Sequence, residues 1–160
     1  MNFNDQLFTF DFKINKQYLV NVWNNKYSRI AEPYTDERYP GKEYKEWLIA
    51  RADDDRYALE LMNLFDVEGK PRFYRLAPNV TLPMHTDLNT TCSINFIIND
   101  NNASVILEDK NQYYYQCGLL DTSRYHSVKN NSSERLLFKI SIFNETFDCI
   151  QKKIQKVVNA

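Results

Sequence analysis

The stretch RLLFKISIF, residues 135–143, alternates like a β-strand that lies between two different environments. One of its faces is wholly apolar and consists of Leu136, Phe138, Ile140 and Ile142. The other face is mixed and consists of Arg135, Leu137, Lys139, Ser141 and Phe143. The stretch CSINFII (92–98) repeats this division, with Ser93, Asn95 and Ile97 on its mixed face. The mixed faces either meet solvent or line a polar cavity inside a barrel.

Short runs of β-branched and aromatic residues surround these two stretches from Pro71 onward. They are separated by the turn-forming residues Asn, Asp, Gly and Ser. This pattern is typical of an antiparallel sandwich or barrel. The expected strands are 72–77, 81–84, 92–98, 104–108, 112–116, 125–129 and 135–143.

The flanking regions show helical periodicity instead. Helices are expected over 14–31, over 53–65 behind the capping run Asp53 to Asp55, and over 145–157. A loop is expected at 32–46. We therefore expect a single domain over 1–160, with a helical part at 1–70, the β core at 71–143 and a C-terminal helix at 144–160 that packs outside the sheets.

Bulk properties exclude several classes of protein. A chain of 160 residues with 43% apolar residues can bury one core. A net charge of −1 gives no basic surface for nucleic acid or for membrane lipids. No apolar run approaches the roughly 20 residues that span a bilayer, and the N-terminus lacks the pattern of a secretory signal. Three cysteines without a CxxC motif predict reduced thiols and a cytoplasmic location. The oligomeric state stays open.

A pair of possible metal ligands lies in LPMHTDLN, residues 82–89. In an extended segment, His85 and Asp87 leave the chain on the same face and can reach one ion. The chain has two histidines, and the second is His126 in DTSRYHSVKN (121–130). Two imidazoles and one carboxylate suit non-haem Fe(II) and leave coordination positions open. The alternative is that these are structural histidines, since an Asp two residues after a His also arises by chance.

Other polar and aromatic residues admit two interpretations. Arg135 lies nine positions beyond His126 and can grip a carboxylate with two hydrogen bonds, or it can form a surface salt bridge. Arg75 can reach a substrate carboxylate or stay exposed on a strand. Trp47 is expected to anchor the core. The tyrosines at 113–115 are expected to serve strand packing.

The order His-x-Asp, about 40 residues, His and then Arg resembles the 2-oxoglutarate- and Fe(II)-dependent oxygenases over roughly Phe73 to Phe143. The chain is most similar to their aspartyl/asparaginyl β-hydroxylase branch. The distal motif of that branch is matched by Asp121, Thr122, Ser123, His126, Val128 and Asn130.

This resemblance implies a mainly β fold with flanking helices and a double-stranded β-helix (jelly-roll or cupin-like) core. It implies that His85, Asp87 and His126 hold iron and that Arg135 binds the distal carboxylate of 2-oxoglutarate. Ser93 and Asn95 fall where that branch places polar co-substrate contacts, and Lys139 could replace or assist Arg135. Many relatives have a Ser where this chain has Leu137.

The function that follows is hydroxylation of a C–H bond of an amino acid or peptide side chain, with O₂ consumed and succinate and CO₂ released. The source of the substrate, a small molecule or a peptide, stays open. Three alternatives remain: a cupin-type metalloenzyme that works without 2-oxoglutarate, a zinc hydrolase, and a jelly roll that only binds a ligand.

Overall fold

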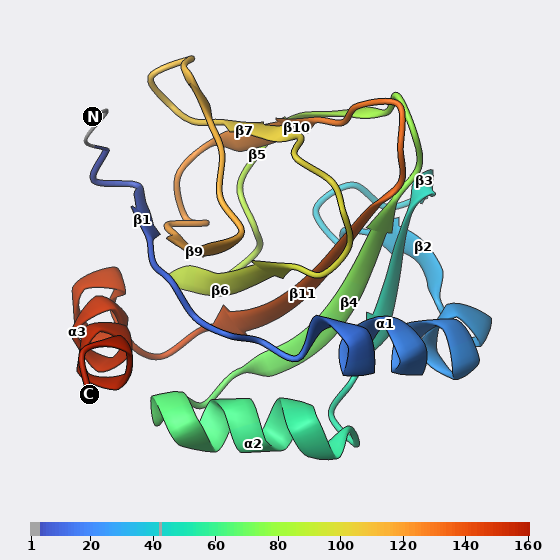
Figure 1. The fold of residues 1–160 in the computed structure, drawn as a ribbon. Coiled ribbons are helices and arrows are strands. Elements are labelled where there is room, and N and C mark those ends of the chain that lie inside the picture. Colours follow the sequence, from blue (N-terminus) through green and yellow to red (C-terminus); the bar gives the residue numbers. More distant parts are fainter. Residues whose placement is uncertain (1–3, 42) are drawn as a thin grey trace.

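The chain folds into two facing antiparallel sheets with helices on one side (Figure 1). The structure is a computed structural model that describes residues 4–41 and 43–160. The large sheet has the strand order β1-β9-β6-β11-β4-β3-β2, and the small sheet has the order β5-β10-β7-β8. The strands of the large sheet are β1 (Leu7–Thr9), β2 (Glu32–Thr35), β3 (Glu43–Arg51), β4 (Lys70–Leu76), β6 (Cys92–Ile97), β9 (Cys117–Leu120) and β11 (Arg135–Ile142). Those of the small sheet are β5 (Thr81–His85), β7 (Ser104–Ile106), β8 (Gln112–Tyr113) and β10 (His126–Lys129).

The path of the chain from β4 to β11 identifies a double-stranded β-helix. Strands β4, β6, β9 and β11 belong to the large sheet, and β5, β7, β8 and β10 belong to the small one. The chain thus crosses between the sheets repeatedly, and the last strand, β11, returns to lie between β4 and β6. This winding is the jelly-roll arrangement, so the expected fold class is confirmed.

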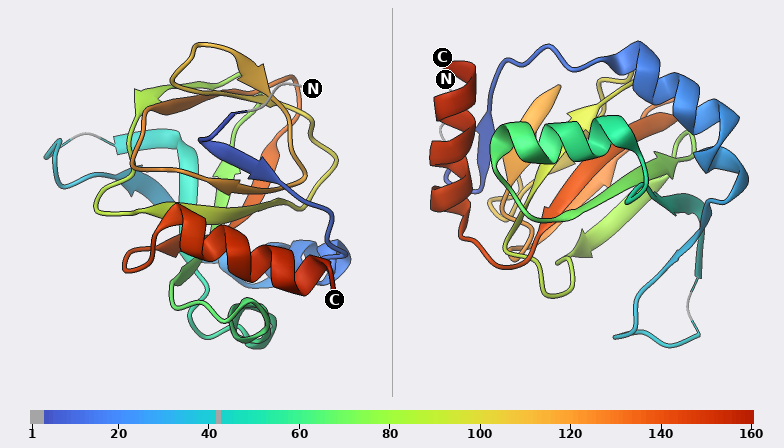
Figure 2. Two further views of the ribbon diagram at one scale, coloured as in Figure 1. Left: turned by 90° about the vertical axis from the view of Figure 1, so that its left-hand side faces the viewer. Right: turned by 90° about the horizontal axis from the view of Figure 1, so that it is seen from below.

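Three α-helices of the described residues flank the barrel. They are α1 (Lys16–Asn25), followed by the short 3₁₀ helix η1 (Tyr27–Arg29), α2 (Arg56–Phe65) and α3 (Phe147–Val158). Helices α1 and α2 cover the face of the large sheet that is turned away from the small sheet (Figure 2). Asp55 caps α2 by accepting a hydrogen bond from the Ala58 amide at 2.9 Å, as the acidic run before this helix predicted. No described helix is long and apolar enough to cross a membrane.

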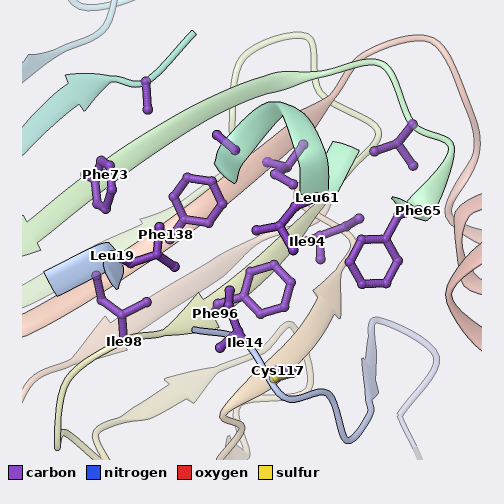
Figure 3. Packing of buried hydrophobic residues seen from close by; sticks show 14 of the residues in the cluster. Ile14, Leu19, Leu61, Phe65, Phe73, Ile94, Phe96, Ile98, Cys117 and Phe138 are labelled. Atoms are coloured by element: carbon purple, nitrogen blue, oxygen red, sulfur yellow. The ribbon is translucent and has the colours of Figure 1, made fainter. Parts of the chain in front are cut away.

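The main core lies between the helices and the large sheet (Figure 3). Phe138, Phe96 and Phe73 from the sheet meet Leu61 and Phe65 from α2, and all five side chains are buried. The apolar faces of β6 and β11 are therefore used against the helices. Their mixed faces must point the other way, into the barrel. These polar and charged residues are buried as well: Ser93, Asn95, Arg135, Lys139 and Ser141. The mixed faces thus point into the barrel interior rather than to solvent.

The N-terminal part differs from the expectation of a helical segment over 1–70. It contributes strands β1, β2 and β3 to the large sheet, and the expected loop at 32–46 contains all of β2 and the start of β3. Pro33, Pro40 and Gly41 favour a loop, but β2, which contains Pro33, is an edge strand, where a missing backbone N–H is tolerated. The helix expected over 14–31 ends at Asn25 and continues only as η1.

Strand β9 was not predicted from the sequence. Its segment CGLL has no alternation to detect, because all four residues are buried. It lies between β1 and β6 in the sheet. A strand covered on both faces reads as a short apolar run, which periodicity alone does not separate from other buried segments.

Gly69 allows β4 to start close against β11. A Cβ at this position would lie 2.6 Å from the Ser141 carbonyl oxygen and 2.8 Å from Cγ2 of Ile140. We expect Gly69→Ala to lower the free energy of unfolding by about 1–3 kcal/mol, because the strand pair must separate to admit the methyl group. Chemical denaturation would measure this, with the exposed neighbour Glu68→Ala as control. An unchanged midpoint for Gly69→Ala would contradict the close approach of the two strands.

Candidate metal centre

The small sheet brings the two histidines together at one end. His85 is the last residue of β5 and His126 is the first residue of β10, and the two are paired directly across the strands. Asp87 follows β5, and its backbone N–H donates to the Thr122 carbonyl at 2.9 Å. One potential ligand atom from each of the three residues lies within 4.8 Å of the others. The predicted triad is therefore one cluster, built from two strands and the loop after β5.

Backbone carbonyls fix the orientation of both imidazole rings. Nδ1 of His85 lies 2.7 Å from the Pro83 carbonyl oxygen, and Nδ1 of His126 lies 2.9 Å from that of Arg124. A carbonyl only accepts hydrogen bonds, so each Nδ1 carries a proton, and Nε2 is the ring atom that is left for a metal. These Nε2 atoms lie 3.5 Å (His85) and 3.4 Å (His126) from Oδ1 of Asp87. Two nitrogen donors and one oxygen donor thus face a common point, a set that fits Fe(II).

Lys139 neutralises the carboxylate from inside the barrel. Its ammonium lies 2.5 Å from Oδ2 of Asp87, and both side chains are largely buried. Burial alone raises the pKa of the Asp87 carboxyl, but the Lys139 ammonium and the two histidines outweigh it and hold that pKa well below its usual value. Burial also opposes the charged amine, yet Asp87 raises the pKa of Lys139. Oδ2 is therefore engaged with Lys139, while Oδ1 is the atom turned toward the histidines.

Arg135 lies in the same interior, on the strand that carries Lys139. Its Nη1 donates to the Ala103 carbonyl at 3.1 Å and its Nη2 donates to the Tyr115 hydroxyl at 3.2 Å. Among the residues that the structure describes, no carboxylate forms an ion pair with this buried guanidinium. A buried charge without a counter-ion is costly, so Arg135 is poised to receive an anion.

The two polar residues of β6 differ in their relation to the interior. Asn95 lines the same cavity as Arg135 and donates to the Tyr115 hydroxyl at 3.0 Å. Ser93 does not line that cavity; its hydroxyl donates to Oδ1 of Asn95 at 2.7 Å. Ser93 thus holds Asn95, and Asn95 and Arg135 share the Tyr115 hydroxyl.

Two hollows meet at the metal centre. An inner cavity of about 50 Å³ lies between the histidines and Arg135. An open groove of about 580 Å³ lies next to this cavity and reaches Asp87. Both are lined by Trp47, Tyr74 and Lys139, so these side chains separate the inner cavity from the groove.

Two aromatic residues lie elsewhere than the sequence predicted, and the structure decides between the two interpretations of one arginine. Trp47, expected in the core, lies on the inner face of β3 and stacks on Tyr34 with ring centroids 4.1 Å apart. Its aromatic character predicted burial, but the helices cover only the opposite face of the sheet. Arg75 pairs with Glu134 at 2.9 Å and lines neither hollow. Tyr115 was assigned to strand packing, and its hydroxyl instead contacts Arg135.

Comparison with solved structures finds similar proteins of very different sequence, and for the first of them the TM-score exceeds 0.5. A prolyl-4-hydroxylase from Pseudomonas putida matches with a TM-score of 0.57 and 14% identity, over 81% of this chain and 86% of that one. An oxidoreductase of the 2OG-Fe(II) oxygenase family from Burkholderia pseudomallei has a TM-score of 0.48 and 11% identity, over 81% and 79%. A cupin domain of a transcriptional regulator from Enterobacter cloacae has a TM-score of 0.46 and 10% identity, over 62% and 99%.

Comparison by sequence adds nothing to this. No family model matches the chain, and no curated protein matches it. The function must therefore be argued from the site.

Proposed function

We propose that this protein is an Fe(II)- and 2-oxoglutarate-dependent dioxygenase that hydroxylates a C–H bond of an amino acid or peptide side chain. The observation that carries the proposal is the convergence of His85, Asp87 and His126 beside a cavity whose far wall holds Arg135, a buried cation that no described carboxylate pairs with. The likeness to the Pseudomonas putida prolyl-4-hydroxylase agrees with it at the level of the fold. The finer placement in the aspartyl/asparaginyl β-hydroxylase branch rests on the distal motif of the sequence, Asp121 to Asn130.

Each residue of the site has a distinct task in this proposal. The two Nε2 atoms and Oδ1 of Asp87 would hold Fe(II), which when bound supplies the O₂-dependent oxidation that converts 2-oxoglutarate to succinate and CO₂. Arg135 would receive the distal carboxylate of 2-oxoglutarate in a two-pronged contact. The Tyr115 hydroxyl orients that guanidinium, Asn95 holds the Tyr115 hydroxyl, and Ser93 holds Asn95.

The inner cavity has consequences for how the co-substrate enters. At about 50 Å³ it is smaller than a five-carbon dicarboxylate requires. Binding of 2-oxoglutarate therefore requires side chains of the wall to move, and the residues shared with the groove, Trp47, Tyr74 and Lys139, are those that can yield toward open space.

The direct test uses protein purified without oxygen. Addition of Fe(II) and 2-oxoglutarate is expected to produce the weak visible absorption of their chelate, and admission of O₂ with a suitable substrate is expected to release succinate. A normally folded protein that binds metal but gives no such band would favour a zinc hydrolase or a cupin-type enzyme. Failure to bind metal at all would favour a jelly roll that only binds a ligand.

Arg135→Gln tests the co-substrate clamp. Loss of a charge-assisted two-pronged contact is expected to weaken 2-oxoglutarate binding by about tenfold to a hundredfold, while Fe(II) binding stays within about twofold. Titration of the visible band with 2-oxoglutarate measures both. Arg75→Gln, on the neighbouring strand and paired with Glu134, is the matched control. Unchanged 2-oxoglutarate affinity in Arg135→Gln would transfer the clamp to Lys139.

A further inference from the structure

The wall of the open groove carries a row of three cations on neighbouring strands. Lys139 on β11 is paired in register with Arg72 on β4, and Arg72 is paired with Arg51 on β3. All three side chains line the groove. Directly opposed residues in an antiparallel sheet have Cα atoms only about 5 Å apart, so like charges at these positions repel each other.

The middle cation of this row, Arg72, has no counter-ion among the residues that the structure describes. Lys139 is paired with Asp87, and Arg51 forms an exposed ion pair with Asp53 at 3.2 Å. Arg72 is half-buried, and its only side-chain hydrogen bond to a described residue is a long one, 3.5 Å, to the Tyr74 hydroxyl. No carboxylate of the described chain forms an ion pair with it. An arginine between two other cations, facing a groove, is arranged to bind an anion from outside.

The rest of the groove restricts the kind of anion. Trp47 and Tyr34 form an aromatic wall on the same side as Arg51, which suits an organic ligand rather than a bare inorganic ion. The lining also holds four acidic residues: Glu32 on the edge strand β2, Asp36 and Glu37 in the turn after it, and Asp87. Asp36 is paired with Arg38, and Asp87 is paired with Lys139. Glu32 is opposite Ile49 and not opposite Arg51. Within the described chain, none of these four carboxylates forms an ion pair with Arg72 or Arg51.

From this juxtaposition we infer that the groove binds a carboxylate of the substrate, with Arg72 as its principal partner and the Trp47–Tyr34 wall supporting the attached carbon skeleton. The groove reaches Asp87, a ligand in the proposed metal site, and for this reason we identify its occupant as the substrate. This identification rests on the proposed function. The anion site itself does not depend on that function. The carboxylate can come from a free amino acid or from an acidic residue of a peptide.

The first experiment uses metal-free protein and a simple probe pair, benzoate and its neutral isostere benzamide. Trp47 borders the groove, whereas Trp23, the second tryptophan, belongs to α1 and is buried in the core. A change in tryptophan fluorescence on addition of the probe therefore reports on the environment of Trp47. We expect benzoate to bind and benzamide to bind at least tenfold more weakly. Arg72→Gln is expected to weaken benzoate binding about tenfold or more. Arg75→Gln, three residues along the same strand and outside the groove, is the matched control.

The outcomes decide the inference. Equal binding of benzoate and benzamide, absence of benzoate binding at millimolar concentration, or an unchanged affinity in Arg72→Gln would each overturn it. Loss of benzoate binding in Arg135→Gln, with Arg72→Gln unaffected, would also overturn it by placing the probe in the inner cavity.

The second experiment identifies the source of the carboxylate. With Fe(II), 2-oxoglutarate and O₂, succinate release is compared for free amino acids, their α-amides and short peptides with and without acidic side chains. Activity confined to free amino acids, or to acidic peptides, supports the inference and names the source. Amides and neutral peptides that react as well as the acids would overturn it. Benzoate binding that depends on Arg72 without any succinate release would keep the anion site and count against the oxygenase.

Discussion

Replacement of His126 by alanine is expected to abolish binding of a divalent metal by the protein. In the proposed metal site His126 is one of three donors, and its ring is oriented by the Arg124 carbonyl toward Oδ1 of Asp87. Loss of groups that merely orient ligands typically costs 10- to 100-fold in metal affinity, and loss of a ligand from a three-residue set is expected to cost more than about 100-fold. Titration of the metal-free protein with Co(II), followed by its visible absorption, measures this loss.

The control for this experiment is the neighbouring Tyr125→Ala, since Tyr125 is exposed and its side chain is not a ligand. Circular dichroism and a denaturation curve of His126→Ala establish that the barrel is still folded. Asp87→Asn is expected to behave like His126→Ala toward metal, because the amide oxygen is a weaker donor than the carboxylate. Metal affinity within tenfold of wild type in His126→Ala would remove the basis of the oxygenase proposal.

The helices and strands whose apolar residues recur at one regular spacing were predictable from the sequence. Those whose burial depends on neighbouring strands were not. Strand β11 alternates cleanly because its two faces meet different environments, helices on one side and a polar interior on the other. Strand β9 is buried on both faces, and β2 contains a proline that only an edge position tolerates. Neither condition is visible until the neighbouring strands are known.

In the site, too, the contacts between residues close in sequence were predictable and those between distant strands were not. His85 and Asp87 are two residues apart, so the local geometry of an extended chain was enough to suggest that they act together. The contact between Lys139 and Asp87 joins residues 52 positions apart and depends on the register of β11 in the barrel. The row of Lys139, Arg72 and Arg51 likewise arises from the pairing of three strands, which no periodicity in the sequence specifies.

Lys139→Met is expected to destabilise the metal-free protein by about 3–5 kcal/mol, because it removes the counter-charge of a buried carboxylate while keeping a similar side-chain volume. A bound divalent metal also compensates Asp87. The destabilisation is therefore expected to shrink to a fraction of this value when the metal is saturating. By the same thermodynamic cycle, Lys139→Met is expected to bind the metal more tightly than wild type, by about tenfold for each 1.4 kcal/mol recovered.

Urea denaturation with and without Co(II) measures the two differences, and Lys129→Met, an exposed lysine on β10, controls for the substitution itself. The double variant Asp87→Asn with Lys139→Met adds a second check: with both charges gone, most of the stability lost in Lys139→Met is expected to return, because no unpaired charge stays buried. An equal loss of stability in metal-free and metal-loaded protein would show that Lys139 acts through packing. In that case the lysine would not be the internal counter-ion that the metal relieves.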